Sequence, residues 1–215
     1  MRRKAIEELY RWKASADRKP LIVQGARQVG KTWLMKEFAK EAYKKCAYVN
    51  FEDNDMLRQL FEHDFDIQRI INSIQWTTGV TIDTDTLIVL DEIQEAPRGI
   101  TALKYFQEKA PEYHVMAAGS LLGIAMHHND SFPVGKVDFI YLYPLSFFEF
   151  LEAVGEKRMV DLLMSKDWQT ITMFRAKFEE RLRQYYFVGG MPAVVAAFAE
   201  DGNLERVRTL QNGIL

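Results

Sequence analysis

The sequence predicts an α/β fold in which helices cover both faces of a five-stranded parallel sheet and a small helical region follows. Along the first 150 residues, short apolar runs alternate with segments of helical periodicity. A glycine-rich segment joins the first apolar run to a helical segment, and two adjacent carboxylates end the third run. Such alternation is typical of parallel sheets whose strands are connected by helices.

The expected elements follow in chain order. The segment up to Ala16 is expected to form an amphipathic helix, because Ile6, Leu9, Tyr10 and Lys13 recur at helical spacing. Short apolar runs predict five strands, at about residues 20–25, 46–52, 86–91, 113–119 and 137–143.

Two helix starts carry capping signals. Asp66 is the expected N-cap of a helix with four isoleucines, and Ser146 and Glu149 have the spacing of a capping box. Beyond Leu151 the strand pattern stops, so residues 1–150 are expected to form the core and residues 151–215 a helical lid or the start of another domain. The chain ends at residue 215 without a clear helix cap, which predicts a piece of a longer protein.

The first motif, Gly25-Ala-Arg-Gln-Val-Gly-Lys-Thr32, has every fixed position of a phosphate-binding P-loop. Glycine at positions 25 and 30 allows several backbone N–H groups to approach a triphosphate closely. Lys31 can supply a cation for the β- and γ-phosphates, and the Thr32 hydroxyl can bind Mg²⁺. The nucleotide-binding residues are therefore expected to be Gly25, Ala26, Arg27, Gln28, Val29, Gly30, Lys31 and Thr32.

The surroundings of this motif favour a P-loop over a glycine-rich turn that matches by chance. An apolar strand pattern precedes the motif, and Leu34, Met35 and Phe38 follow it at helical spacing. The motif thus opens a helix, whose positive N-terminal dipole favours a bound anion.

A second motif, Thr86-Leu-Ile-Val-Leu-Asp-Glu92, joins a buried strand to two carboxylates at its C-terminal end. Ligands of open parallel sheets bind outside that end. Asp91 is therefore expected to hold Mg²⁺ through water, and Glu92 to orient or deprotonate the attacking water. An Asp-Glu pair can merely cap the next helix, but the upstream P-loop favours the catalytic interpretation.

Other polar residues near strand ends have open interpretations. Ser120 follows the fourth expected strand, where it can reach the γ-phosphate or the attacking water, or can cap a helix that begins at Leu121. Glu52 and Asp53 end the second strand, and capping or solvation is favoured there over a role in the water network around Mg²⁺.

Composition indicates an ordinary globular chain. Its 215 residues are 48% hydrophobic and 27% charged, and the net charge of −2 gives no global attraction to nucleic acid or anionic membranes. Cys46 is the single cysteine, so an internal disulfide is excluded and a small buried hydrophobe is its expected role. No apolar stretch approaches the roughly 18 residues that span a bilayer, and no signal peptide is visible, so the cytoplasm is the expected compartment.

Six segments together resemble the prokaryotic AAA+-like P-loop ATPases whose core is followed by a C-terminal domain of unknown function. They are the P-loop, Leu90-Asp-Glu-Ile-Gln94, and residues 118–122, 132–136, 143–150 and 186–192. The Pro-Leu-Ser-Phe and Gly-Gly-Met-Pro sequences are specific to that family, whose members usually continue well past the end of this chain.

The resemblance implies an additional-strand P-loop fold, a three-layer sandwich with Mg²⁺-dependent ATP hydrolysis and Ser120 in the sensor position. The chain departs from the family at Lys136, where members often have arginine, and lysine lacks the planar fork of a guanidinium group. Arg98 and Arg158 are unranked candidates for an arginine that acts in trans.

The sequence thus predicts an ATPase that uses ATP and Mg²⁺, with Lys31, Glu92 and Ser120 in the catalytic roles. One alternative is a nucleotide-dependent regulatory switch with negligible turnover of its own. Another is a small-molecule kinase, which the adjacent carboxylates and the lack of an obvious acceptor pocket disfavour. A homo-oligomer is compatible with the sequence and no membrane association is expected, whereas a nucleic-acid or protein partner, and the process that ATP drives, cannot be read from the residues.

Overall fold

The computed structural model describes residues 3–53, 55–119 and 135–214. They divide into two compact units between Leu142 and Tyr143: residues 5–142, here called the α/β unit, and residues 143–214 with Arg3 and Lys4, here called the helical unit. The expected domain boundary at residue 150 lies eight residues beyond Leu142 and stays a prediction.

The α/β unit contains one five-stranded sheet in the order β2-β3-β4-β1-β5, and all its strand pairs are parallel. β4 therefore lies between β1, which leads into the P-loop, and β3, which ends in the acidic pair. This is the additional-strand arrangement, and the predicted α/β fold with a parallel sheet is confirmed. The strands are β1 Leu21–Gln24, β2 Lys45–Asn50, β3 Thr86–Asp91, β4 His114–Gly119 and β5 Asp138–Tyr141.

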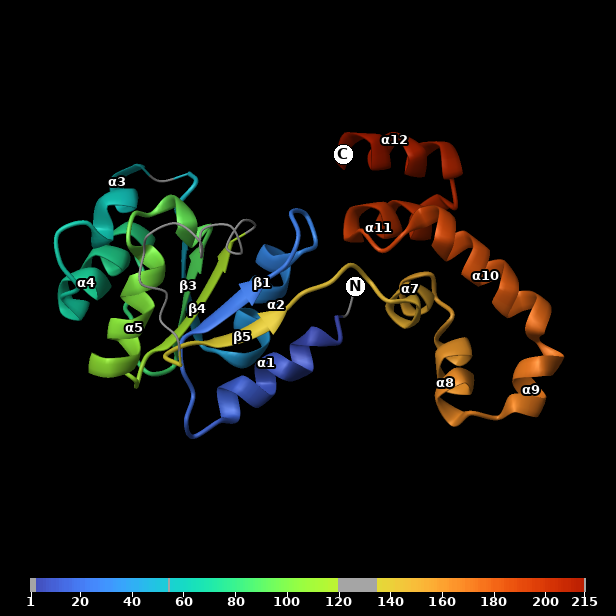
Figure 1. Cartoon of the computed structure of the whole chain (residues 1–215), viewed down its shortest axis with the longest axis horizontal. Helices are drawn as coiled ribbons and strands as arrows, with labels where there is room; N and C mark the ends of the chain where they lie inside the picture. The colour runs from blue at the N-terminus through green and yellow to red at the C-terminus, as the bar shows by residue number, and fades with distance from the viewer. Residues whose placement is uncertain (1–2, 54, 120–134, 215) are drawn as a thin grey trace. The chain divides into compact units, whose positions relative to one another are not determined.

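Helices cover the two faces of this sheet, which makes three layers (Figure 1). Side chains alternate along each strand, so Ile88 and Leu90 join the core under α4 and α5 while Leu87 and Val89 join the core under α1 and α2. β3 is buried along its whole length, as expected for an interior strand of a covered parallel sheet. The helices of this unit are α1 Ala5–Ala14, α2 Lys31–Ala42, α3 Asp55–Arg58, α4 Ile67–Thr78 and α5 Gly99–Lys109, with 3-10 turns η1 Gln59–Phe61 and η2 Ile93–Glu95.

The capping signals act as expected in this unit. The Asp66 carboxylate accepts a hydrogen bond from the backbone N–H of Arg69 at 3.1 Å, and the four isoleucines of α4 are buried. In α1, Ile6 and Leu9 are buried, but Tyr10 is 42% exposed and Trp12 is buried instead. The apolar stripe of this helix is therefore shifted from the predicted one.

Cys46 is only half-buried, against the core under α1 and α2. Burial raises the pKa of its thiol, which favours the unreactive protonated form. The expected small buried hydrophobe is thus partly buried.

The helical unit consists of short helices around a small core of its own (Figure 1). Ser146 and Glu149 form the predicted capping box at the start of the first helix. Gly190 lies so close to the preceding loop that an added Cβ would be 2.5 Å from the carbonyl oxygen of Leu145. The two family-specific sequences therefore pack against each other. The helices are α7 Phe147–Ala153, α8 Lys157–Ser165, α9 Trp168–Met173, α10 Arg175–Val188, α11 Pro192–Asp201 and α12 Leu204–Ile214.

Within the described ranges, none of the helices has both the length and the apolar character that crossing a membrane requires.

Candidate nucleotide site

The P-loop connects β1 to α2 at the carboxyl edge of the sheet. Its two glycines are required for different reasons. A Cβ on Gly25 would lie 2.3 Å from the carbonyl oxygen of Leu142, whereas Gly30 has φ +95°, a left-handed conformation that residues with a side chain rarely adopt. Gln28 also has a positive φ, of 62°. The backbone thus turns tightly just before the N-terminus of α2, whose N–H groups and dipole favour an anion.

The Lys31 side chain folds back over this loop. Its Nζ atom donates to the carbonyl oxygens of Gly25 and Ala26, both at 2.9 Å, and the residue is only 6% exposed. Burial lowers the pKa of the amine, although the nearby charges of Glu92 and Asp91 oppose this shift. A buried cation that contacts only carbonyl dipoles has lost much of its hydration without gaining an ion pair in the described part of the chain.

Asp91 lies at the end of β3 and is 2% exposed. Its Oδ2 atom accepts from the Thr32 hydroxyl at 2.6 Å and from the Tyr48 hydroxyl at 2.9 Å, and its Oδ1 atom accepts from the Glu92 backbone N–H at 3.1 Å. The structure thus brings together Thr32 and Asp91, the two residues expected to hold Mg²⁺. The Asp91 carboxylate is held by donors from three different elements, which fixes its orientation.

Tyr48 was not identified from the sequence. It lies on β2, two residues before Asn50, which pairs with Asp91 across the β2–β3 ladder. Side chains two apart on a strand share a face, so this register sends the Tyr48 ring toward the P-loop side, where the Lys36 ammonium lies 3.9 Å from its centre. The sequence carried no signal for this contact, because neither the pairing of β2 with β3 nor its register is readable from one sequence.

Glu92 directly follows Asp91 and adopts the left-handed conformation, with φ 49° and ψ 47°. For a residue with a side chain this conformation costs about 1 kcal/mol. Gln94 Nε2 donates to Glu92 Oε2 at 2.5 Å. Gln94 belongs to a segment that carries the family resemblance, but no role was predicted for it.

Several other predicted residues are absent from this site or lie outside the described residues. Ser120 lies outside them, so its sensor role stays a prediction. The Asp53 carboxylate accepts a hydrogen bond from the side-chain amide of Asn50 at 2.8 Å, and its expected capping or solvated role stays a prediction. Lys136 forms an ion pair with Glu108 at 3.1 Å. Arg98 donates to the Glu62 carbonyl oxygen at 2.7 Å, so both cations have partners within their own unit.

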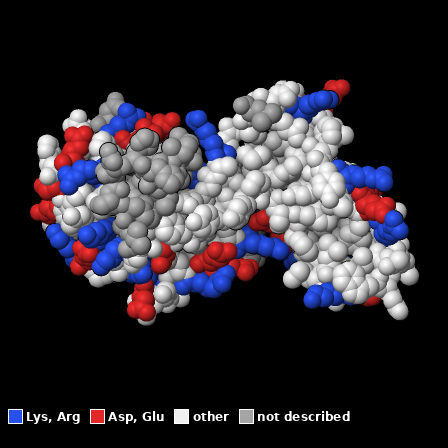
Figure 2. Space-filling view, in the orientation of Figure 1, with Lys and Arg blue, Asp and Glu red and all other residues white. Residues whose placement is uncertain are grey.

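A second kind of site would be marked by a metal cluster among the described residues or by a basic stripe on the face drawn in Figure 2. No group of three or more metal-ligating side chains occurs among the residues the structure describes. On the face shown in Figure 2, positive and negative side chains of the α/β unit are interspersed. This distribution agrees with the small net charge and gives no sign of a nucleic-acid interface on that face.

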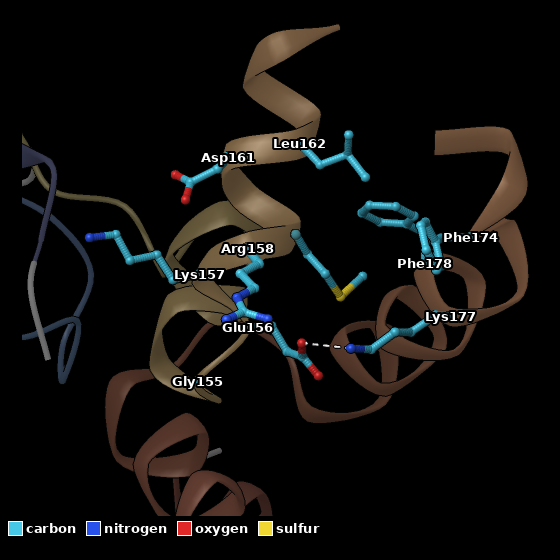
Figure 3. Close-up of a pocket in the computed structure, with 10 residues that line it drawn as sticks. Gly155, Glu156, Lys157, Arg158, Asp161, Leu162, Phe174, Lys177 and Phe178 are labelled. Atoms are coloured by element: carbon cyan, nitrogen blue, oxygen red, sulfur yellow. Dashed lines mark hydrogen bonds and ion pairs between the residues drawn. The ribbon is translucent and has the colours of Figure 1, made fainter. Parts of the chain in front are cut away.

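The helical unit has a hollow of about 660 Å³ beside α8 and α10 (Figure 3). One carboxylate of its lining, Glu156, pairs with Lys177 at 2.9 Å and with Arg181 at 2.7 Å. Hydrogen bonds from these two cations lower the pKa of Glu156, so it is a neutralised structural carboxylate and a poor acid or base. The apolar lining residues are Met159, Leu162, Phe174 and Phe178.

Solved structures with similar folds share little sequence with this chain. PCH-2 from C. elegans is 16% identical with a TM-score of 0.41, and the match covers 75% of this chain and 45% of that one. The ORC2 protein of Aeropyrum pernix, solved as ADPNP-ADP complexes, is 19% identical with a TM-score of 0.45, covering 74% and 52%. Cdc6p from Pyrobaculum aerophilum is 12% identical with a TM-score of 0.40, covering 65% and 42%. The chain thus spans about half the length of these proteins.

Sequence comparison identifies a family directly. No curated protein matches the chain, but the family model described as an AAA domain matches residues 17–151. This region includes the P-loop, the acidic pair and all five strands. Because the match covers more than half of its 215 residues, the chain belongs to the AAA domain family of nucleotide-binding P-loop ATPases.

Proposed function

We propose that the α/β unit binds ATP with Mg²⁺ and hydrolyses it to ADP and phosphate. The observation that carries this proposal is the 2.6 Å contact between the Thr32 hydroxyl of the P-loop and the Asp91 carboxylate of β3. This contact joins the P-loop to the acidic pair, the two motifs that an ATPase site requires, and Glu92 directly follows Asp91 in the chain.

The loop has the chemistry that a triphosphate requires. The backbone N–H groups of residues 26–32 and the Lys31 ammonium are the proposed phosphate ligands. Lys31 would exchange two carbonyl contacts for phosphate oxygens, which are charged and therefore stronger acceptors. Gly25 supports the role of the loop as a phosphate-binding backbone. Because its Cα lies so close to Leu142, only glycine fits there, and the first turn of the loop therefore carries no side chain.

Thr32 and Asp91 fit a magnesium ion. Mg²⁺ prefers hard oxygen ligands and usually keeps several waters, with one or two protein side chains beside the substrate phosphates. A hydroxyl and a carboxylate within 2.6 Å of each other provide that donor set. When bound, the ion neutralises charge on the triphosphate.

Glu92 is the proposed general base, and Ser120 is retained as the proposed sensor. Glu92 takes a proton from water as the water oxygen forms a bond to the γ-phosphorus. The bond between the γ-phosphorus and the bridging oxygen breaks, ADP leaves with that electron pair, and Lys31 stabilises the charge that develops there. A carboxylate rather than an amide is needed at position 92, because only the carboxylate can accept the proton.

Two substitutions test this assignment. Glu92→Gln should retain ATP binding and lose about 10²- to 10⁴-fold in turnover, the usual contribution of a general base. Lys31→Ala should instead weaken ATP binding itself. Single-turnover assays with the unmodified chain separate a competent ATPase from a regulatory switch. Unchanged hydrolysis by E92Q would remove Glu92 from its role, and undiminished ATP affinity in K31A would contradict the site.

A further inference from the structure

A residue of the turn after β3 contacts the Glu92 side chain, which belongs to the same turn. Gln94 Nε2 lies 2.5 Å from Glu92 Oε2. An ionised carboxylate can only accept hydrogen bonds, so the amide nitrogen of Gln94, and not its oxygen, must face Glu92. This assigns the orientation of the Gln94 amide independently of the rest of its surroundings.

Gln94 projects from a fixed backbone. It is the central residue of η2, whose N-cap is the left-handed Glu92. The neighbouring Ile93 is fully buried, and its carbonyl oxygen accepts from the Ala96 N–H at 3.1 Å. A Cβ on Gly99 would lie 2.8 Å from that same oxygen. The turn is therefore held closely against the start of α5, and Gln94 has a rigid base.

Fold stability does not explain a glutamine at this position. Its Oε1 atom is buried and accepts no hydrogen bond from the described residues. A buried amide oxygen without a donor is unfavourable, and an aliphatic side chain of similar size would avoid that cost. The contact that does require an amide is the one to Glu92.

We propose, on the basis of the hydrolysis proposed above, that Gln94 is a positioning residue for Glu92. Its amide restricts rotation of the Glu92 carboxylate, so that the carboxylate keeps the orientation from which it takes the proton of the attacking water. A glutamate side chain otherwise has several rotamers, and each misaligned one reduces the fraction of productive encounters. Gln94 contributes to turnover through Glu92 and has no part in holding nucleotide.

Gln107 provides a matched control for this role. It lies on α5, and its Oε1 atom is also buried with no hydrogen bond from the described part of the chain. Gln94→Leu and Gln107→Leu therefore remove the same kind of unpaired oxygen. Q94L should lower kcat about 10-fold, the usual effect of losing an outer-shell contact, with the KM for ATP and the Kd for nucleotide within about 2-fold of wild type. Q107L should leave kcat, KM and Kd unchanged.

A double-mutant cycle with Glu92→Gln distinguishes positioning from a general structural effect. If Gln94 acts through Glu92, Q94L should cause no further loss of single-turnover rate in the E92Q background. Gln94→Glu, which keeps the side-chain length but replaces the donor by a carboxylate, should lose at least as much as Q94L and covers the case in which Q94L folds poorly.

The outcomes separate the two proposals. Unchanged or faster turnover in Q94L and Q94E, or additive losses in the cycle, would overturn the role of Gln94. The proposed hydrolysis would still stand in that case, provided that E92Q loses turnover as expected. A parallel fall in nucleotide affinity would also overturn it. Wild-type turnover in E92Q would instead remove the hydrolysis mechanism on which the role depends.

Discussion

Buried charges serve different purposes in the two units. In the helical unit, Arg3 and Glu149 are 4% and 6% exposed and pair with each other, with Arg3 Nε 3.1 Å from Glu149 Oε1. In the α/β unit, Lys31 and Asp91 are equally buried, but Lys31 donates to carbonyl oxygens and Asp91 accepts from hydroxyls and an N–H.

This difference indicates which buried charges maintain the fold and which are available for chemistry. In the Arg3–Glu149 pair the two opposite charges neutralise each other, and Glu149 also accepts from the backbone N–H groups of Lys4 and Ser146. Lys31 and Asp91 contact neutral groups, which a charged ligand can replace as partners at little cost. Removal of a charge should therefore destabilise the helical unit and leave the α/β unit folded but inactive.

The largest effect is expected for Glu149→Ala. It leaves the Arg3 guanidinium buried without its carboxylate and removes half of the capping box, so the free energy of unfolding should fall by about 3–5 kcal/mol. Urea denaturation measures this change. Glu152→Ala, at an exposed position of the same helix, is the control and should have almost no effect. A comparable loss in both variants would contradict the assigned role of the pair.

The lowered pKa of Glu149 predicts that stability depends on pH. Burial alone would raise the pKa of Glu149, but the N–H groups of Ser146 and Lys4 and the charge of Arg3 outweigh burial and lower it. Because the folded-state pKa lies below the unfolded-state value, the stabilisation is complete above the unfolded pKa of about 4.3 and is lost as the pH falls through the folded-state pKa. Denaturation of wild type and Glu149→Gln between pH 7 and 3 tests this, and the variant should have the flatter profile.

Two glycines allow the next comparison, because each approaches a carbonyl oxygen in its own unit. Gly190→Ala should reduce the free energy of unfolding by about 1–3 kcal/mol, since the backbone at Leu145 must shift. Gly25→Ala should reduce ATP affinity at least 10-fold, because the shift at Leu142 distorts the P-loop. Gly213→Ala is the control, since its Cβ would meet nothing within 4 Å. Full ATP affinity in G25A would contradict the close approach.

A change of opposite sign is expected for Lys31→Met. The substitution removes a buried cation and keeps an apolar stem of similar length, so the free energy of unfolding should rise by about 1 kcal/mol while ATP binding is lost. Lys40→Met, on the exposed side of the same helix, should change neither property. Thermal and chemical denaturation with nucleotide titration check both variants, and a destabilised K31M would show that Lys31 maintains the fold as well.

Local patterns explain why most of the fold was predictable. Each of the five expected strands overlaps an observed one, and β3 coincides with its predicted range, because a run of apolar residues bounded by polar ones signals a covered strand. The cap at Asp66 and the capping box at Ser146 were also readable, since each depends on residues three positions apart.

Contacts between distant residues were not predictable in the same way. Arg3 and Glu149 are 146 residues apart, and the hydroxyl of Tyr48 reaches Asp91 across a strand register that periodicity does not specify. The Gln94 contact is local, but it depends on the left-handed conformation of Glu92, which is rare for residues with a side chain. The proximity of Thr32 and Asp91 was predictable, because the P-loop and the acidic pair each follow a strand of the same parallel sheet and ligands bind at the C-terminal ends of such strands.

The smallest effect should come from Tyr48→Phe. This substitution tests whether the neutral donors around Asp91 orient its carboxylate. Loss of one hydroxyl contact should cost about 1 kcal/mol and raise the Mg²⁺ concentration for half-maximal turnover about 5-fold, with Mg²⁺-free nucleotide affinity unchanged. Tyr43→Phe is the matched control, because its hydroxyl contacts His114 Nδ1 at 2.6 Å at the other end of α2. Equal Mg²⁺ dependence in Y48F and Y43F would mean that Thr32 and the Glu92 N–H suffice to orient Asp91.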